Sequence, residues 1–78
     1  MNVATAPASE TVGSYLDRAG IRHEVRVRRV EAQIWEIVDV PDQGDEVLVD
    51  RLTGELESRD TATAVAQDYL TQAPARAD

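Results

Sequence analysis

A period-two alternation of apolar and polar side chains fills the middle of this 78-residue sequence, and it restricts the fold to one built on a β-sheet. In 21–27, apolar residues and His23 alternate with arginines and one glutamate, which is typical of a half-buried strand. Two further runs, 30–40 and 46–52, are rich in valine, isoleucine and leucine. Turn residues at 41–45 and at Thr53-Gly54 bound the last run. The sequence therefore predicts three antiparallel strands.

The connection between the first two runs, 28–31, contains no glycine, proline, asparagine or aspartate. Such residues mark tight turns, so their absence leaves two interpretations open. The two runs are either separate strands joined by a hairpin or one long bent strand.

Helical spacing flanks the predicted strands on both sides. Ser9 is a candidate N-cap, although Glu10 could also begin the helix, and Gly20 is a candidate C-cap. Between them, apolar residues recur at helical spacing: Val12, Tyr15, Leu16 and Ala19. A second helix begins at Asp60 or Thr61, ends at Pro74 and carries the apolar stripe Val65, Ala66, Tyr69 and Leu70.

These elements predict a small two-layer α+β domain with the order helix, three antiparallel strands, helix. The domain spans 10–73, with a disordered lead at 1–9 and a flexible tail at 74–78. The residues expected to face the helices are Ile21, Val25, Val27, Ile34, Val38, Val47 and Val49. The residues expected on the open side of the sheet are Trp35, Ile37, Leu48 and Leu52.

Composition limits the function classes. Without cysteine and with one histidine, the chain has no material for a disulfide scaffold or a zinc site. All eight basic residues are arginine, and the lysine-free chain carries a formal charge of -7, which argues against direct nucleic-acid binding. No segment has the ~18 apolar residues of a membrane span, and the first 15 residues do not resemble a signal peptide. We expect a cytoplasmic protein that does not associate with membranes.

Trp35 is the only tryptophan of the chain, and two interpretations of it stay open. On an open sheet face, beside Ile37 and Leu48, it would be an anchor for a protein partner. If helices cover both faces, it belongs to the core.

The charges are distributed unevenly along the chain. Residues 17–30 carry an excess of +3, and residues 31–60 carry an excess of -8. One interpretation is that oppositely charged strands pair across the sheet, for example Arg26 or Arg28 with Glu36. The other is an acidic surface that meets a basic partner, because carboxylates can occupy arginine sites meant for phosphates.

No catalytic or cofactor-binding constellation stands out. The acidic residues around the turn at 41–45 could hold a hard cation, but their spacing is not that of an EF-hand, and a solvated loop is the preferred interpretation. His23 has the apolar parity of its strand, which favours a satisfied, half-buried imidazole over a catalyst. No serine or threonine is grouped with a base, so we expect no enzyme, no metal and no cofactor.

The hairpin segment resembles that of PepSY-type domains. The similarity lies in Trp35 to Val40, an acidic turn, and a valine strand that ends in Asp50, Thr53-Gly54 and Glu55. The preceding helix also fits the order of that family. The resemblance implies a non-catalytic inhibitory or binding module.

These observations favour a small, acidic, non-enzymatic protein-binding or regulatory module that acts through an open sheet face and an acidic turn. The alternatives are a phage-type acidic inhibitor that mimics nucleic acid, a PepSY-like module, and an accessory subunit of a larger assembly. The partner would be a protein with a basic surface, and self-association through the same face is possible. The predicted partner-binding residues are Trp35, Glu36, Ile37, Asp39, Asp42, Asp45, Glu46, Leu48 and Asp50.

Overall fold

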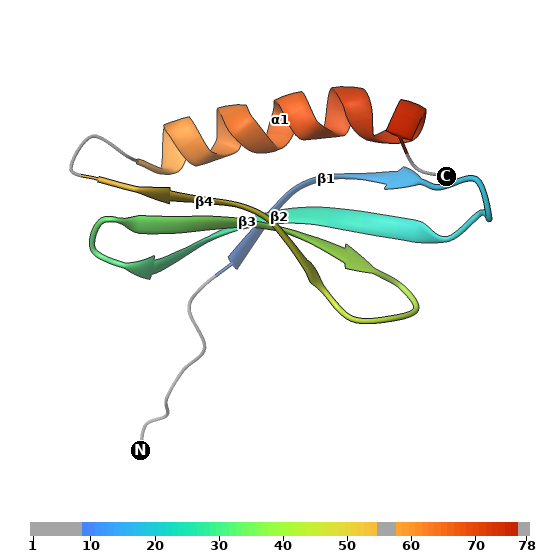
Figure 1. Cartoon of the computed structure of the whole chain (residues 1–78), viewed down its shortest axis with the longest axis horizontal. Helices are drawn as coiled ribbons and strands as arrows, with labels where there is room; N and C mark the ends of the chain where they lie inside the picture. Colours follow the sequence, from blue (N-terminus) through green and yellow to red (C-terminus); the bar gives the residue numbers. More distant parts are fainter. Residues whose placement is uncertain (1–8, 55–57, 77–78) are drawn as a thin grey trace, which may run out of the picture.

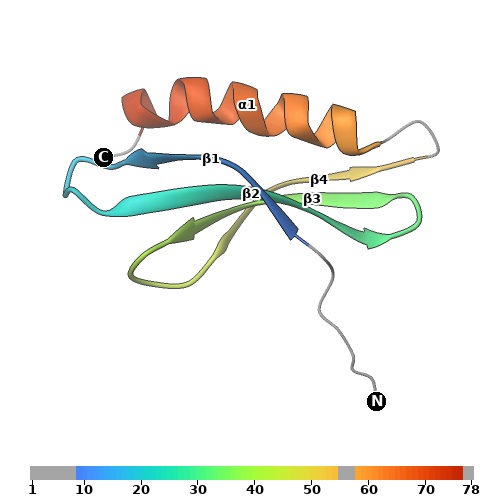
Figure 2. The same ribbon diagram turned by 180° about the vertical axis from the view of Figure 1, so that it is seen from behind.

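The structure is a computed structural model that describes residues 9–54 and 58–76. Its elements are four strands and one helix: β1 (Ser9–Leu16), β2 (Arg22–Glu31), β3 (Ile34–Pro41), β4 (Val47–Thr53) and α1 (Arg59–Arg76). The strands form one antiparallel sheet in the order β1-β2-β3-β4 (Figure 1). The helix lies on one side of this sheet in both opposed views (Figures 1 and 2).

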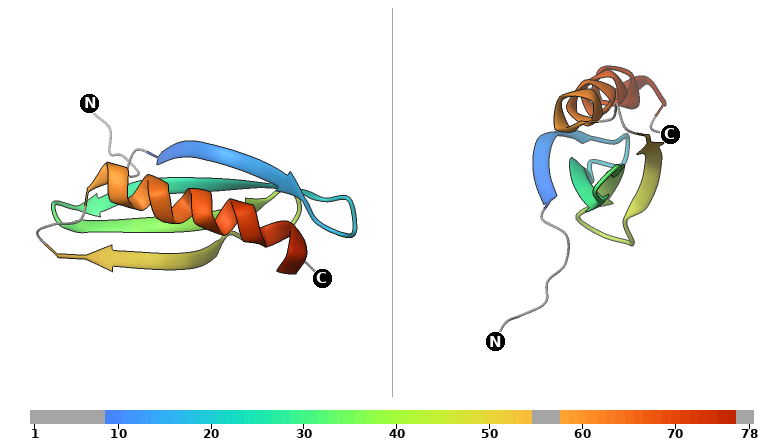
Figure 3. Two further views of the ribbon diagram at one scale, coloured as in Figure 1. Left: turned by 90° about the horizontal axis from the view of Figure 1, so that it is seen from above. Right: turned by 90° about the vertical axis from the view of Figure 1, so that its left-hand side faces the viewer.

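The helix runs roughly along the strands (Figure 3). Its first turns lie over the end of the sheet that carries the β2–β3 turn, and its last turns lie over the end that carries the β1–β2 turn. The two ends of the helix therefore cover two different parts of the sheet.

The predicted fold class is wrong in two respects: the sheet has four strands, and the segment expected to form an N-terminal helix is strand β1. The β1–β2 register shifts between Thr11 and Gly13, so Val12 is the extra residue of a β-bulge. Val12 and Tyr15 pack on the core, and Gly13 lies directly beneath Leu70 of the helix. The adjacent residues Val12 and Gly13 both face the helix, which breaks the period-two pattern of a strand. The apolar residues of β1 are therefore spaced like those of a helix.

Gly13 lies close beneath α1. A Cβ added at this position would lie 2.7 Å from Leu70 Cδ1, so the end of the leucine side chain would have to shift. Gly20, predicted as a helix C-cap, instead lies in the turn between β1 and β2 with a φ of 83°.

The open question about 28–31 is settled in favour of two strands, β2 and β3, which are joined by a turn at Ala32-Gln33. The predicted turn at 41–45 is confirmed as the connection between β3 and β4. At the second predicted turn, Thr53 is the last residue of β4 and Gly54 N donates to the Gln33 carbonyl oxygen; residues 55–57 lie outside the described residues, so this turn stays a prediction. The β2–β3 register then decides which face each residue of β3 occupies, because Val27 pairs with Ile37 and Arg29 pairs with Trp35.

The predicted faces of β3 are consequently exchanged. Ile37 is fully buried beneath the helix, in the core that contains Val25, Val27, Ala62 and Ala66, and Trp35 packs against this core. Val38 lies on the opposite face with Leu48, its partner in β4. Of the other assignments, Leu52 packs against the core and Val47 is exposed, contrary to expectation, whereas Val49 packs inward as predicted.

The C-terminal helix is confirmed with different ends. It begins at Arg59, where the Ser58 side chain accepts a hydrogen bond from Thr61 N at 3.3 Å and acts as the N-cap. It continues past Pro74 to Arg76. Residues 1–8 and 77–78 lie outside the described residues, and the proposed lead and tail stay predictions. No helix in 9–54 or 58–76 is long and apolar enough to cross a membrane.

Candidate binding site: the Trp35 pocket

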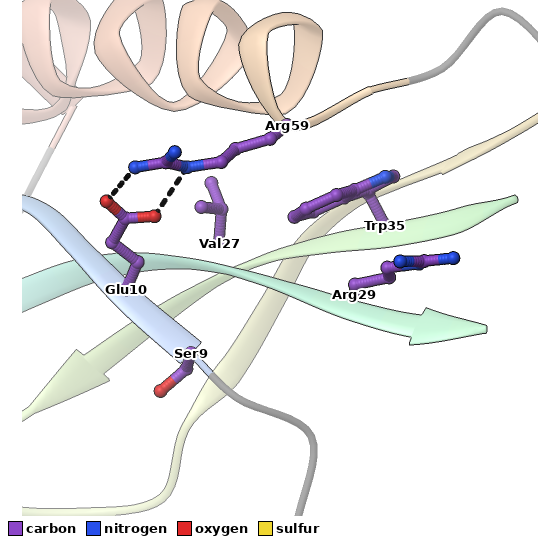
Figure 4. A pocket seen from close by; sticks show the side chains of 6 residues that line it. All are labelled: Ser9, Glu10, Val27, Arg29, Trp35 and Arg59. Carbon is purple, nitrogen blue, oxygen red and sulfur yellow. Dashed lines mark hydrogen bonds and ion pairs between the residues drawn. The ribbon is translucent and has the colours of Figure 1, made fainter. Parts of the chain in front are cut away.

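A pocket of about 420 Å³ opens at the end of the sheet where α1 begins. Three strands and the helix contribute to it, so residues far apart in the sequence meet there (Figure 4). We call it the Trp35 pocket, and its lining residues are Ser9, Glu10, Val27, Arg29, Trp35 and Arg59.

The sheet register places the apolar part of this pocket. Val27 is buried and Trp35 is half-buried, and both residues lie on the helix-facing side of the sheet. Trp35 is flanked by its two cross-strand neighbours, Arg29 in β2 and Leu52 in β4. The indole thus has one part packed on the core and another part at the pocket.

Two arginines and one glutamate supply the charges. Arg59, the first residue of α1, donates to both carboxylate oxygens of Glu10 and ties the start of the helix to β1 (Figure 4). This hydrogen-bonded pair holds the pKa of Glu10 below its ordinary value. Arg29 is exposed, and its Nε donates a hydrogen bond to the Glu31 carbonyl oxygen at 3.4 Å.

Arg29 forms no ion pair with any residue in the described part of the chain. Because Glu10 neutralises Arg59, the pocket keeps the charge of Arg29 and is locally cationic in a chain of net charge -7. An aromatic face with an accessible guanidinium beside it is suited to binding rather than to bond cleavage.

A second polar cluster lies beneath the other end of the helix, around His23. Its Nδ1 lies 2.6 Å from Asp39 Oδ1, and its Nε2 lies 2.8 Å from Asp17 Oδ2. Carboxylates only accept, so a protonated ring satisfies both contacts at once. The hydrogen bond with Asp17 is the largest influence that raises the pKa of His23, and the bond with Asp39 adds to it.

Asp39 joins this cluster to the helix. Its Oδ2 accepts hydrogen bonds from the Tyr15 and Tyr69 hydroxyls, both at 2.6 Å. Burial alone would raise the pKa of Asp39, but the hydrogen bonds from the two tyrosines and His23 together lower it. Burial, followed by the bond to Asp39, raises the pKa of Tyr15 far above its ordinary value.

The His23 cluster therefore joins β1, β2, β3 and α1. The rings of Tyr15 and His23 also stack, with centroids 4.7 Å apart. Both ring nitrogens of His23 are engaged by carboxylates, which favours a structural role over a general base. This arrangement is the satisfied imidazole that the sequence predicts.

The open face of the sheet carries paired charges. Glu36 is buried and accepts hydrogen bonds from Arg28 and Arg51, and Arg28 also pairs with Glu46. The predicted pairing of Arg28 with Glu36 is confirmed. Glu36 and Glu46 are thus neutralised within the sheet, whereas Asp42, Asp45 and Asp50 are exposed.

The structure separates the predicted partner-binding residues into three groups. Trp35 lines the pocket, whereas Ile37, Glu36 and Asp39 are buried at other places in the sheet. The others are exposed along the β3–β4 hairpin and the edge strand β4: Asp42, Asp45, Glu46, Leu48 and Asp50. In the described residues, no group of three or more histidine, aspartate and glutamate side chains is placed to hold a metal ion.

Sequence reasoning missed most of the pocket. Glu10 and Arg59 are 49 positions apart, and no periodicity links them. A hairpin turn at Ala32-Gln33 would not have been enough to find Arg29, because the register shift between Arg29 and Glu31 is what places Arg29 opposite Trp35.

Comparison with protein-family models, with curated proteins and with solved structures finds no match to this chain. The hairpin that resembles PepSY-type domains does form, as β3 and β4. The segment expected to form the preceding helix is strand β1, which removes the agreement in element order.

Proposed function

We propose that this chain is a small, non-enzymatic protein-binding module and that its contact site is the Trp35 pocket. The observation that carries the proposal is an open pocket with a half-buried tryptophan and, at its edge, Arg29, which has no ion-pair partner within 9–54 and 58–76. Tryptophan and arginine supply a large share of the binding energy at protein interfaces. A pocket with an apolar floor and a few convergent polar groups is also the usual form of a binding site.

The net charge supports a protein partner over a nucleic acid. A nucleic-acid binder needs several cations on one surface to neutralise phosphates. The pocket offers one arginine that no carboxylate of the described residues pairs with, in a chain of charge -7.

A second candidate surface lies on the β3–β4 side of the molecule. Val47 and Leu48 are 58% and 51% exposed, and the acidic turn residues Asp42 and Asp45 lie close to them in the chain. This surface would suit a basic partner or a second copy of the chain. A nucleic-acid mimic would have to act through the turn acids, because Glu36 and Asp39 are engaged within the fold.

Affinity capture from a lysate of the source cell, with three matched variants, tests the proposal. Arg29→Glu reverses the free charge of the pocket, and Trp35→Leu removes the indole but keeps apolar volume beneath the helix. Loss of an interface hot spot should lower the captured amount of the partner by at least about tenfold in both variants.

Leu48→Gln is the control on the other surface, and it should capture the partner as the wild type does. Circular dichroism and thermal unfolding establish that each variant is folded. Equal capture by the wild type and both pocket variants would refute the proposal, and loss with Leu48→Gln alone would favour the second surface.

A further inference from the structure

We infer that the Trp35 pocket binds the C-terminal residue of a partner chain, with its carboxylate at Arg29 and its apolar side chain against Trp35. This inference rests on the proposed function and names the chemistry of the occupant.

Charge complementarity gives the sign of the ligand. Glu10 already engages Arg59, and no carboxylate of the described residues pairs with Arg29. A guanidinium binds a carboxylate through two parallel hydrogen bonds, and such charge-assisted bonds are stronger than neutral ones. A ligand with one carboxylate therefore matches the pocket, whereas a cationic ligand would meet the charge of Arg29.

The spacing of Arg29 and Trp35 limits the position that the carboxylate can have within the ligand. The two residues are direct cross-strand partners on the same face of the sheet, so their Cβ atoms are about 5 Å apart. The ligand must carry its charge and its apolar group equally close together. A C-terminal apolar residue does so, because its carboxylate and its side chain leave the same Cα. An internal aspartate or glutamate ends in its carboxylate and has no apolar group at that position.

The size of the pocket agrees with a chain end. Its volume of about 420 Å³ is near the lower end of the ~300–1,000 Å³ typical of ligand sites. That space suits one or two residues better than a segment that passes through.

Three small probes test the inference in the intact protein: N-acetyl-phenylalanine, its C-terminal amide, and N-acetyl-aspartic acid α-amide. Trp35 is the only tryptophan, so its fluorescence, excited apart from tyrosine, reports directly on the pocket. We expect N-acetyl-phenylalanine to bind about tenfold more tightly than its amide, the lower end of what a charge-assisted hydrogen bond contributes. The aspartate probe, with a side-chain carboxylate only, should bind no better than the amide.

Arg29→Gln is the test variant and should reduce binding of the acid to the level of the amide. Arg18→Gln, in the turn at the other end of β1, makes the same change of charge and should keep the preference for the acid.

The outcomes distinguish this inference from the proposed function. Equal binding of the acid and the amide, or a preference for the aspartate probe, overturns the C-terminal carboxylate but leaves the pocket as a binding site. Absence of binding by all three probes also overturns the inference, and the capture experiment then decides on the proposed function independently.

Discussion

Asp39, in β3, is hydrogen-bonded to three other elements of the fold. It is 4% exposed and accepts hydrogen bonds from one side chain each in β1, β2 and α1. The parity of β3 places it among apolar inward positions, where an unpaired carboxylate would be costly. Its three partners explain why it is tolerated there.

Asp39→Asn should therefore destabilise the protein by about 2–4 kcal/mol, because it removes a buried charge from hydrogen-bonded partners that stay in place. Urea unfolding followed by circular dichroism measures the change. Asp42→Asn, the same substitution at an exposed turn position, is the control and should change stability by less than about 0.5 kcal/mol. A loss of similar size in the two variants would contradict the role of Asp39.

At the scale of elements, the strands of the central sheet and the C-terminal helix are predictable from periodicity. The 21–27 run alternates cleanly and becomes most of β2. The apolar stripe of α1 packs on the core as expected; its members are Val65, Ala66, Tyr69 and Leu70. Both segments present one face to the core without interruption, so a local pattern carries enough information.

The predictions from the sequence fail in β1 and β3, where the sheet is irregular or its register is not encoded locally. The bulge at Val12 turns two consecutive residues inward, and strand β1 is mistaken for a helix. In β3 both parities are apolar, and the position of the β2–β3 turn decides between them. That turn has no glycine or asparagine, so neither face nor pairing follows from the local sequence.

The candidate site was predictable only in part for the same reason. Trp35 was singled out because it is unique, but its exposure and its neighbours depend on the register with β2 and on the docking of α1. The pairing of Glu10 with Arg59 is a property of the tertiary structure alone.

At the scale of the whole molecule, the free energy of unfolding should decrease at both high and low pH. The pKa of His23 is raised in the folded state, so its contribution is fully present below its ordinary value of 6.5 and is lost as the pH rises through the folded value. The pKa values of Asp17, Glu36 and Asp39 are lowered, so their contributions are present above about pH 4 and are lost as the pH falls.

We therefore expect maximal stability between about pH 4.5 and 6.5. Urea unfolding across a pH series measures this profile. His23→Gln should remove the decline that begins above pH 6.5, because the group whose pKa is raised is gone. The part of the acid limb that comes from Glu36 should remain, because Arg51 and Arg28 lower the pKa of that carboxyl. An unchanged alkaline limb in that variant would show that another group causes the decline.

Three places in the molecule hold different arrangements of charged and aromatic side chains. The open sheet face is a ladder of paired arginines and glutamates, and the His23 cluster is closed beneath the helix. The Trp35 pocket combines an aromatic surface with the accessible guanidinium of Arg29, which pairs with no carboxylate in the part of the chain that the structure describes. The central claim is that this pocket is where a protein partner binds.

Site-specific photo-crosslinking tests that claim most directly. A benzophenone amino acid is placed at Arg59, whose exposed side chain borders the pocket, or at Leu48, which is exposed on the open face. Each full-length protein is irradiated in a lysate of the source cell. We predict a discrete crosslinked protein from position 59 and none from position 48; a crosslink from position 48 without one from position 59 would contradict the claim.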